Sequence, residues 1–432
     1  MGKPQKKQNQ KSSAVNPVKQ KRNQEAERQK QQLELEKQRM PQECPDGVVN
    51  LQFTPIDTWF FRESRPHDAV GASVLSSLFP PPIKTLIGTV RSFLGDSIEI
   101  NWKTLISEIY PDFNFTQALG NNNGLGKLSV RGAWVCKENQ RLYPAPFYLM
   151  HKDEDFMRLQ IGDKVECDLG NVRLPELPKG NAGYKGLEQT WITREGWQTL
   201  LQGETPVKEE LIQAKDLFQN EPRLGIARNN QTRSALEGKL YQTQHLRLEN
   251  DVTIELDVKG LNEALAEKLP VETKHEILRL GGEGRMAVLA KKSHYLLLPT
   301  LIIDKQPLKK IIIHFITPAY FGGQMFPENF DKHEIDGQTV WQGKLLDIEL
   351  IIEAAVIGKA HREGGWDMQK HQPRSVKSYI PVGSAWFCRV VTEISNEDLL
   401  EKLHGQSIGA EIEWGRGQIL IGLWNDTKTQ GK

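Results

Sequence analysis

The stretch with the clearest chemical potential is RLGGEGRMAV, residues 279–288, in which three glycines lie between two arginines. Glycine weakens the interior of a strand or helix by roughly 0.5–1 kcal/mol relative to alanine, so this density predicts a tight strand–loop–strand connection. Backbone amides that no side chain covers can bind phosphates while nearby cations neutralise their charge. The candidate phosphate-contacting residues are Arg279, Gly281, Gly282, Gly284 and Arg285. On composition alone, a plain glycine turn is the alternative.

A second group of cations lies on and before an expected helix over residues 82–95, which follows three prolines. Lys84, Gly88 and Arg91 have the spacing i, i+4 and i+7, so they share one helical face. A glycine between two cations leaves a shallow groove that fits a sugar-phosphate chain, although a solvated helix face would look the same. Arg62 and Arg65 follow an aromatic strand-like segment just upstream.

A third group lies in the glycine-broken segment 358–381, where cations alternate with aromatic residues. This mixture suits single-stranded RNA, because bases stack on aromatic rings for roughly 1–3 kcal/mol each. A solvated loop is the alternative. The candidate contacts here are Arg362, Trp366, Lys370, Arg374 and Lys377.

Evidence for catalysis in the sequence is thin. The chain has no zinc-protease, serine-hydrolase or nucleotide-binding loop motif, and its four cysteines lack metal-ligand spacing. Three histidines near cations are candidates for general acid–base cleavage of RNA. They are His67, His361 and His371. We therefore assign no catalytic residue, metal ligand or cofactor.

Charge is spread unevenly over the 432 residues. Residues 1–40 contain eleven Lys and Arg and four Glu, a net charge of +7, so the rest of the chain carries −6 against an overall +1. Any contact of the folded part with nucleic acid must then use local basic patches. We expect the Gln- and Lys-rich tail, residues 1–47, to be disordered or a lone solvated helix, with RNA contact or an inert role both open. Met40 is a candidate alternative translation start.

The order of the expected elements indicates an α+β protein. A strand near Val48, the helix over 82–95, a hairpin over 128–150 and a helix over 193–203 give a β-α-β-β-α order, typical of a ferredoxin-like module. A similar series follows in the second half, with helices expected over 262–269 and 396–404, the latter capped by Ser395. A strand is expected over 408–414, before a turn at Gly415–Gly417 that is a weak signal by itself. We therefore expect two ferredoxin-like (RRM-like) domains with glycine-rich loops and insertions, at residues 48–215 and 216–432. No stretch is long and apolar enough to span a membrane.

Six motifs in order resemble those of a known family. They are PIDTWFFRESRP, SLFPPPIKTLIGTVRSFLG, RLGIARNNQTRSALEGKLYQTQHLRL, LRLGGEGRMAV, GGWDMQKHQPRSVKSYIPVGSAWF and GRGQILIGLW. Between about Val48 and Trp424 the chain resembles the third subunit of the type III-B CRISPR effector, the Cmr complex, a five-group RAMP protein.

This resemblance implies a subunit that grips the 5′ repeat-derived tag of the CRISPR RNA. Its implied neighbours are the large polymerase-like subunit and a backbone RAMP subunit, in a cytoplasmic antiviral complex. The resemblance also implies that it is not the nuclease. The glycine loop and the early arginines match family motifs, whereas the contacts of Lys84, Arg91, Arg362 and Lys370 are inferred from charge and spacing. Two alternatives stay open: a RAMP endoribonuclease that processes CRISPR RNA precursors, and a pure protein adaptor.

Overall fold

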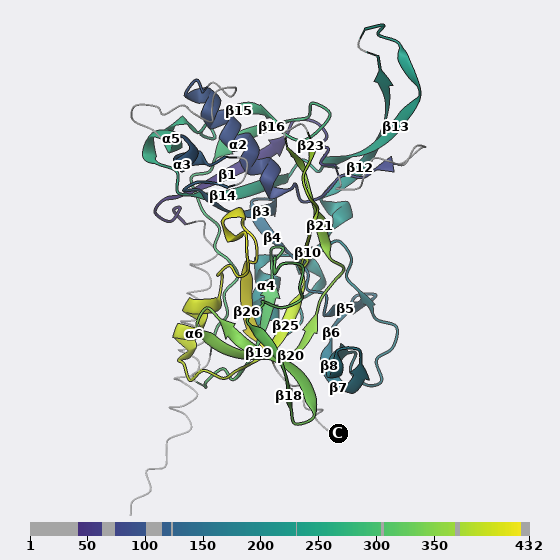
Figure 1. Ribbon diagram of the computed structural model, residues 1–432, viewed down its shortest axis with the longest axis vertical. Coiled ribbons are helices and arrows are strands. Elements are labelled where there is room, and N and C mark those ends of the chain that lie inside the picture. The colour runs from purple at the N-terminus through teal and green to yellow at the C-terminus, as the bar shows by residue number, and fades with distance from the viewer. Residues whose placement is uncertain are drawn as a thin grey trace, which may run out of the picture.

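A computed structural model gives the fold as a mixed α/β protein in which strands predominate (Figure 1). It describes residues 42–62, 74–100, 115–121, 124–229, 231–303, 306–367 and 372–424. The tail expected to be disordered therefore lies almost wholly outside the described residues. Two large antiparallel sheets form the body, one above the other in Figure 1.

The first sheet is built around β1 (Val48–Pro55), which pairs with β14 (Val252–Lys259) on one side and β16 (Met286–Lys291) on the other. The full strand order is β11-β10-β4-β3-β14-β1-β16-β15. The remaining strands are β3 (Ser129–Lys137), β4 (Gln140–Pro144), β10 (Thr190–Ile192), β11 (Leu211–Gln213) and β15 (Glu276–Arg279). All neighbouring pairs are antiparallel.

Helices cover one face of this sheet. α2 (Ile83–Ser97) buries Leu86, Ile87, Val90 and Leu94 in the same core as strand residues from β1 and β14. The helical spacing of these apolar residues is the reason that one side of α2 faces the sheet. The short helices α5 (Glu263–Lys268) and α3 (Phe115–Leu119) lie near it.

The opposite face of the first sheet carries a buried ionic network. Arg141 lies 2.8 Å from Glu255 and 2.6 Å from Asp257, and Asn50 donates to Asp257 at 2.8 Å. Arg141 also donates to the carbonyl of Leu296 at 3.2 Å. Because Leu296 belongs to the segment between the two sheets, the network attaches that connection to the first sheet.

The second sheet has the order β18-β19-β20-β25-β17-β26. Its strands are β17 (Lys310–Phe315), β18 (Phe330–Ile335), β19 (Gln338–Leu345), β20 (Ile348–Val356), β25 (Ala385–Val390) and β26 (Ile419–Leu423). α6 (Asn396–Leu403) buries Leu399 and Leu403 in the core of this sheet. Between β17 and β20, all of whose residues are described, the chain forms no helix.

A helix from the first half packs on the second sheet. α4 (Arg194–Leu201) places Trp197, Leu200 and Leu201 in the core shared with β17 and β26. The contact is close, because a Cβ added at Gly422 would lie 3.2 Å from the Cα of Leu201. α4 therefore ties the two halves together.

Smaller elements extend from this body. β12 (Phe218–Arg228) and β13 (Ala235–Leu248) form a long hairpin that projects from it, with β2 (Val74–Leu75) beside β13 (Figure 1). Two small sheets lie beside the second sheet: β5 (Leu149–Lys152), β6 (Asp155–Arg158) and β9 (Lys185–Gly186), and then β7 (Gln160–Cys167) and β8 (Gly170–Glu176). The short 3-10 helices are η1 (Lys208–Glu210), η2 (Ala214–Asp216) and η3 (Ile412–Trp414).

An extended arm links the second half to α2. It consists of β21 (His361–Glu363) paired with β24 (Lys377–Tyr379), and β22 (Trp366–Asp367) paired with β23 (Gln372–Pro373). In Figure 1 it runs from the lower sheet up to the upper one.

The expected division at residues 215 and 216 does not separate the two sheets. β14 and β16 come after that point yet complete the sheet that β1 begins, while α4 comes before it and packs on the second sheet. The sheets change between β16 and β17. The prediction placed the boundary by sequence order, whereas strand pairing joins segments that are about 200 residues apart.

Candidate nucleic-acid interface

The glycine loop joins β15 to β16, as the sequence predicts, and packs against the segment after β1. Gly281 and Gly284 have φ of +87° and +65°, which favours glycine. Gly282 donates its N–H to the carbonyl of Phe60 at 2.8 Å, and a Cβ at Gly281 would lie 2.6 Å from that same oxygen. Gly281 is thus required by contact with the protein's own chain, whereas a Cβ at Gly282 would lie 3.1 Å from the Phe60 ring. Gly284 alone of the three has open space beside it.

Arg285 belongs to a group of five charged residues that we call the hairpin-root cluster. Its members are Asp57, Glu221, Arg223, Arg247 and Arg285. Asp57 lies 3.1 Å from Arg285, 3.2 Å from Arg223 and 3.0 Å from Arg247. Burial opposes ionisation of Asp57, but hydrogen bonds from Arg223, from the backbone N–H of Thr58 and from Arg247 together lower its pKa. The cluster carries three positive and two negative charges.

The α2 face and the arm meet at a second charged group, the junction cluster. It consists of Lys84, Glu363, Lys377, Glu411 and Arg416. Glu411 lies 2.7 Å from Lys377 and 3.8 Å from Lys84, and Arg416 lies 2.5 Å from the buried Glu363. Burial lowers the pKa of Lys84, and this effect is larger than the opposing effect of Glu411 and Glu363. Two predicted RNA contacts, Lys84 and Lys377, are therefore paired with an acid inside the protein.

The turn Gly415–Gly417, a weak signal in the sequence, has a structural reason at this junction. A Cβ at Gly415 would lie 2.8 Å from Ile83 and 2.9 Å from the carbonyl of Val130. The loop therefore lies directly against α2 and β3, where only glycine leaves enough space.

Arg91 differs from Lys84 on the same helix face. It donates to the carbonyl of Asn121 at 3.0 Å, and its buried Nε has no hydrogen-bond partner in the part of the chain that is described. Burial and the positive charge of Arg374 lower the pKa of Arg91 to about 10. Among the described residues, no atom would lie within 4 Å of a Cβ added at Gly88, between the two cations of the helix. The structure thus brings Arg91 of the helix close to Arg374 of the arm, which itself lies 4.0 Å from Asp367.

The other predicted contacts are dispersed. Arg279 and Arg362 are exposed, and Trp366 is 52% exposed opposite Pro373 on the arm. Arg62 pairs through its backbone with Ser77, and burial lowers its pKa. Arg65, Lys370, His67 and His371 lie outside the described residues. His361 lies 3.6 Å from Glu363, within the junction.

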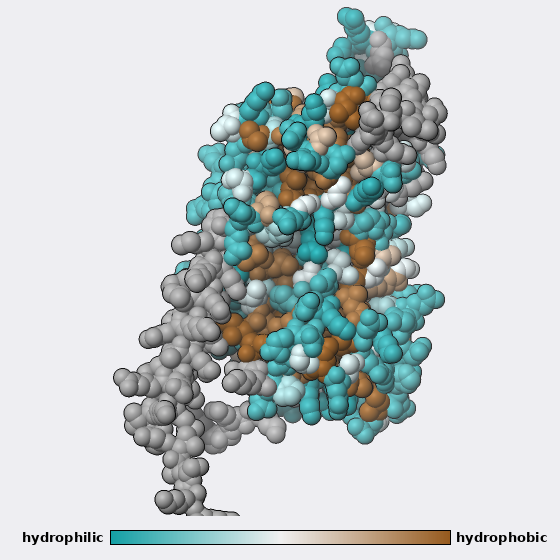
Figure 2. Space-filling view, turned by 90° about the vertical axis from the view of Figure 1, so that its left-hand side faces the viewer, coloured by the Kyte–Doolittle hydropathy of each residue, from teal (hydrophilic) through white to brown (hydrophobic). Residues whose placement is uncertain are grey.

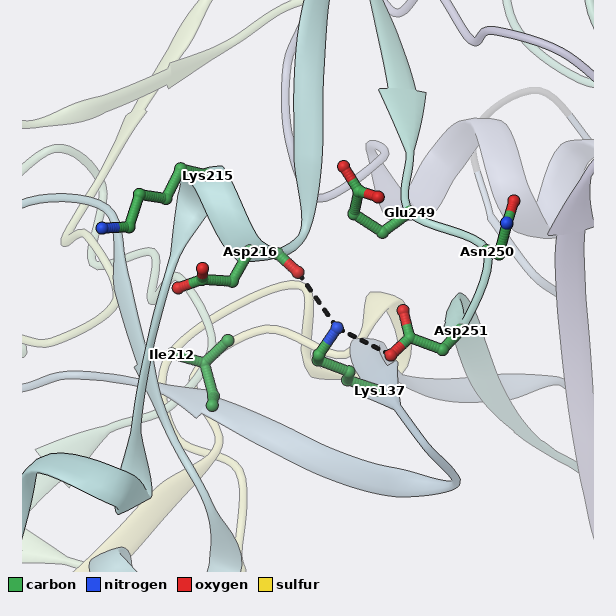
Figure 3. A pocket seen from close by; sticks show the side chains of 7 residues that line it. All are labelled: Lys137, Ile212, Lys215, Asp216, Glu249, Asn250 and Asp251. Atoms are coloured by element: carbon green, nitrogen blue, oxygen red, sulfur yellow. Dashed lines mark hydrogen bonds and ion pairs between the residues drawn. The ribbon is translucent and has the colours of Figure 1, made fainter.

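Elsewhere the surface is mixed. Figure 2 shows hydrophilic and hydrophobic residues interleaved over the face on the left of Figure 1. An open depression of about 570 Å³ lies beneath the hairpin root, where Lys137 contacts Asp251 at 2.7 Å and the carbonyl of Asp216 at 3.2 Å (Figure 3). None of the predicted RNA contacts lines it.

Two absences hold for the described part of the chain. It contains no group of three or more His, Cys, Asp or Glu that could hold a metal ion. It also contains no helix long and apolar enough to cross a membrane.

A family model for the CRISPR-associated protein Cas_Cmr3 matches residues 51–424. The chain belongs to this CRISPR-associated family. The resemblance seen in the six motifs is confirmed, and the Cas_Cmr3 chain is a type III-B CRISPR effector subunit. No match was found among curated proteins.

Solved structures show remote similarity to this Cas_Cmr3 chain. A chain in "Cryo-EM structure of the Type III-B Cmr-beta bound to cognate target RNA and AMPPnP, state 1" is 14% identical with a TM-score of 0.42, covering 78% of this chain and 86% of that one. A chain in "Crystal structure of Csm3-Csm4 subcomplex in the type III-A CRISPR-Cas interference complex" is 10% identical with a TM-score of 0.37, covering 87% and 99%. The family assignment rests on the family model.

Sequence reasoning missed the acids that contact the cations of the candidate interface. Asp57 and Glu411 each contact two or more of its cations, yet neither stood out among the 55 Asp and Glu of the chain. The signal that could have found Asp57 is its place directly after a strand, two residues before Trp59. Glu411 has φ of +60°, a backbone conformation that its residue type does not indicate.

Proposed function

We propose that this chain is a non-catalytic CRISPR RNA-binding subunit of its effector complex. It grips the 5′ repeat-derived tag and anchors the large polymerase-like subunit beside a backbone RAMP subunit. The complex acts in the cytoplasm in antiviral defence. Membership of the Cas_Cmr3 family supports an effector subunit, and the site geometry supports the RNA contact.

The proposal includes two ferredoxin-like units. In the first sheet the strands β1, β3, β14 and β16, numbered in chain order, lie in the order 4-1-3-2, and α2 and α5 connect them as the fold requires. In the second sheet β17, β20, β25 and β26 repeat the order 4-1-3-2, with α6 as the second helix. The first helix of this unit is lacking, and α4 packs on the sheet instead.

The observation that carries the RNA contact is Arg91. A guanidinium that is largely buried, next to another arginine and without an acidic partner among the described residues, is costly unless an anion binds there. Gly88 leaves space beside it for a polymer backbone. A phosphate in this site would satisfy the Nε of Arg91 and reduce its repulsion with Arg374. The exposed Trp366 on the same arm is available for stacking with an unpaired base.

The test is RNA binding by the full chain with Arg91→Ala and with Arg374→Ala. The control is Lys179→Ala, which removes one positive charge from a side chain that is 89% exposed and whose partner is Asp163, a residue outside both charged clusters. Fluorescence anisotropy would use a single-stranded RNA carrying the repeat-derived tag. We expect at least about tenfold weaker binding at 50 mM salt for either variant, and a salt slope reduced by about 0.7 for each lost phosphate contact. Unchanged affinity in both variants would contradict the site.

The non-catalytic part of the proposal has its own test. The wild-type chain is incubated with a CRISPR RNA precursor in the presence of EDTA, alongside His361→Ala. We expect intact precursor in both reactions. Specific cleavage that disappears in His361→Ala would instead support the endoribonuclease.

A further inference from the structure

The projecting β12–β13 hairpin is attached to the body at two levels. At the inner level Trp59 and Leu246 exchange backbone hydrogen bonds at 2.8 Å, and Thr58 contacts the buried His245 at 3.1 Å. β2 adds a short parallel pairing with β13. These contacts are largely buried or made by the backbone, so they fix the root of the hairpin.

The outer level consists of side chains that water can reach. Arg223 and Arg247 project from the same face of the hairpin, and both contact Glu221 and Asp57. Tyr241, further along β13, lies 3.4 Å from Glu283 in the glycine loop. Exposed ion pairs of this kind are individually weak and exchange readily for other charged partners.

Asp57 is the member of the cluster that links the hairpin to the glycine loop. Its Oδ2 lies 3.1 Å from Arg285 of the loop and 3.2 Å from Arg223 of the hairpin, while Oδ1 lies 3.0 Å from Arg247. Glu221, by contrast, contacts the two hairpin arginines, whereas the carboxylate that contacts Arg285 is that of Asp57. One carboxylate therefore divides its charge between two elements.

We propose that Asp57 couples occupancy of the glycine loop to the position of the hairpin. This inference rests on the proposed RNA-binding function and adds a form of regulation to it. A phosphate that reaches Arg285 competes with the Asp57 carboxylate, because both are anions and the guanidinium presents a limited number of donors. When a phosphate displaces Asp57 from Arg285, the outer attachment of the hairpin weakens. The hairpin then pivots about its inner level.

Reciprocity gives the sign of the effect on binding. If bound RNA weakens the Asp57 contact, then loss of the Asp57 charge must favour bound RNA by the same factor. Asp57→Asn is expected to bind tagged RNA about two- to fivefold more tightly, the range of one exposed ion pair. Glu221→Gln is the matched control, because it removes the same charge from the same cluster without touching Arg285.

The hairpin position is measured by spin-label distances in the full chain. Labels are placed on Leu240→Cys in the hairpin and Glu267→Cys on α5, with Cys44 and Cys167 replaced by serine. We expect a narrow distance distribution for the wild type without RNA, and a broader one when tagged RNA is bound. Asp57→Asn should be broad without RNA and unchanged by it. Glu221→Gln should follow the wild type.

Each result decides between the two proposals. RNA that binds without changing the distances, or a narrow distribution in Asp57→Asn, overturns the coupling and leaves RNA binding in place. Equal tightening by Asp57→Asn and Glu221→Gln shows a general charge effect and also overturns the coupling. Absence of RNA binding by the wild type overturns the proposed function itself, and the coupling with it.

Discussion

At the scale of single residues, the cations of the interface differ in what already neutralises them. Lys84, Lys377 and Arg285 have carboxylate partners within the protein, whereas Arg91 has none in the described ranges. Charge and spacing identify all four in the sequence, but their partners are remote. Asp57, for example, is 228 residues from Arg285. The sequence therefore predicts the presence of a basic site better than which cations are available in it.

In the glycine loop, the cost of positive φ and the cost of steric contact can be measured separately. Gly284→Ala introduces a side chain at positive φ into open space, for a loss of about 1–2 kcal/mol. Gly281→Ala adds a steric conflict with the Phe60 carbonyl, for about 1–3 kcal/mol more. Urea unfolding of both variants measures the difference. Equal losses would show that the contact with Phe60 does not constrain the loop.

Arg141 is the residue whose replacement should be most damaging. Arg141→Met leaves Glu255 and Asp257 buried without their cation, which costs about 3–5 kcal/mol. The free energy of unfolding in urea tests this. Lys179→Met serves as the control, since its partner Asp163 is 90% exposed and such a change is worth within about 0.5 kcal/mol. A similar loss in both variants would contradict a special role for the buried network.

At the scale of elements, short helices are predicted well when a capping residue precedes their first turn. Thr193, Asn262 and Ser395 are expected caps or helix starts, and each accepts a backbone N–H at the N-terminus of its helix. The strand expected over residues 408–414 is wrong. Positive φ at Gly409, Glu411 and Gly415 breaks extended structure there, and part of the segment forms η3. Those angles arise from close contact with distant elements, which no local pattern reveals.

Neutral His314 connects β17, β26 and the segment before β5. It lies on β17, its Nδ1 donates to Leu420 of β26 at 3.3 Å, and its Nε2 accepts from Tyr148 at 2.8 Å. Burial lowers its pKa to about 3. Below the ordinary pKa of 6.5 the unfolded chain gains a proton that the folded chain does not, so stability falls as pH falls. The loss approaches about 1.4 kcal/mol per pH unit between pH 6.5 and 3.

His314→Gln removes this titration while keeping one donor and one acceptor. We expect the stability difference between variant and wild type to shift in the variant's favour by about 2 kcal/mol from pH 6.5 to 5. Urea unfolding at both pH values checks this. Parallel pH profiles of the two proteins would show that His314 is not the group responsible.

At the scale of the whole molecule, the two halves share their elements. The repeated strand pattern in the sequence predicts two sheets. It does not predict that α4, from the first half, packs on the second sheet, because no residue of α4 indicates which sheet it covers. Its apolar face fits any sheet of suitable curvature. Assigning α4 to the second sheet requires the knowledge that no helix lies between β17 and β20.

Dividing the chain after residue 305 tests this exchange. The fragment 306–432 lacks α4, so the core around Ile311, Ile313 and Leu420 loses the cover of Trp197 and Leu200. We expect this fragment alone to be insoluble or to unfold without cooperativity, and to fold when expressed together with residues 1–305. Circular dichroism and urea unfolding measure both. A fragment that unfolds cooperatively on its own would show that α4 is dispensable.

The position of α4 also sets an order on the ribosome. About 110 residues are synthesised between its last residue, Leu201, and the first residue of β17, Lys310. At roughly 5–20 residues per second this takes about 5–20 s. During that interval the apolar side of α4 has no part of the second sheet to cover and is exposed to solvent. A chaperone that binds short apolar segments would therefore have this interval in which to bind α4.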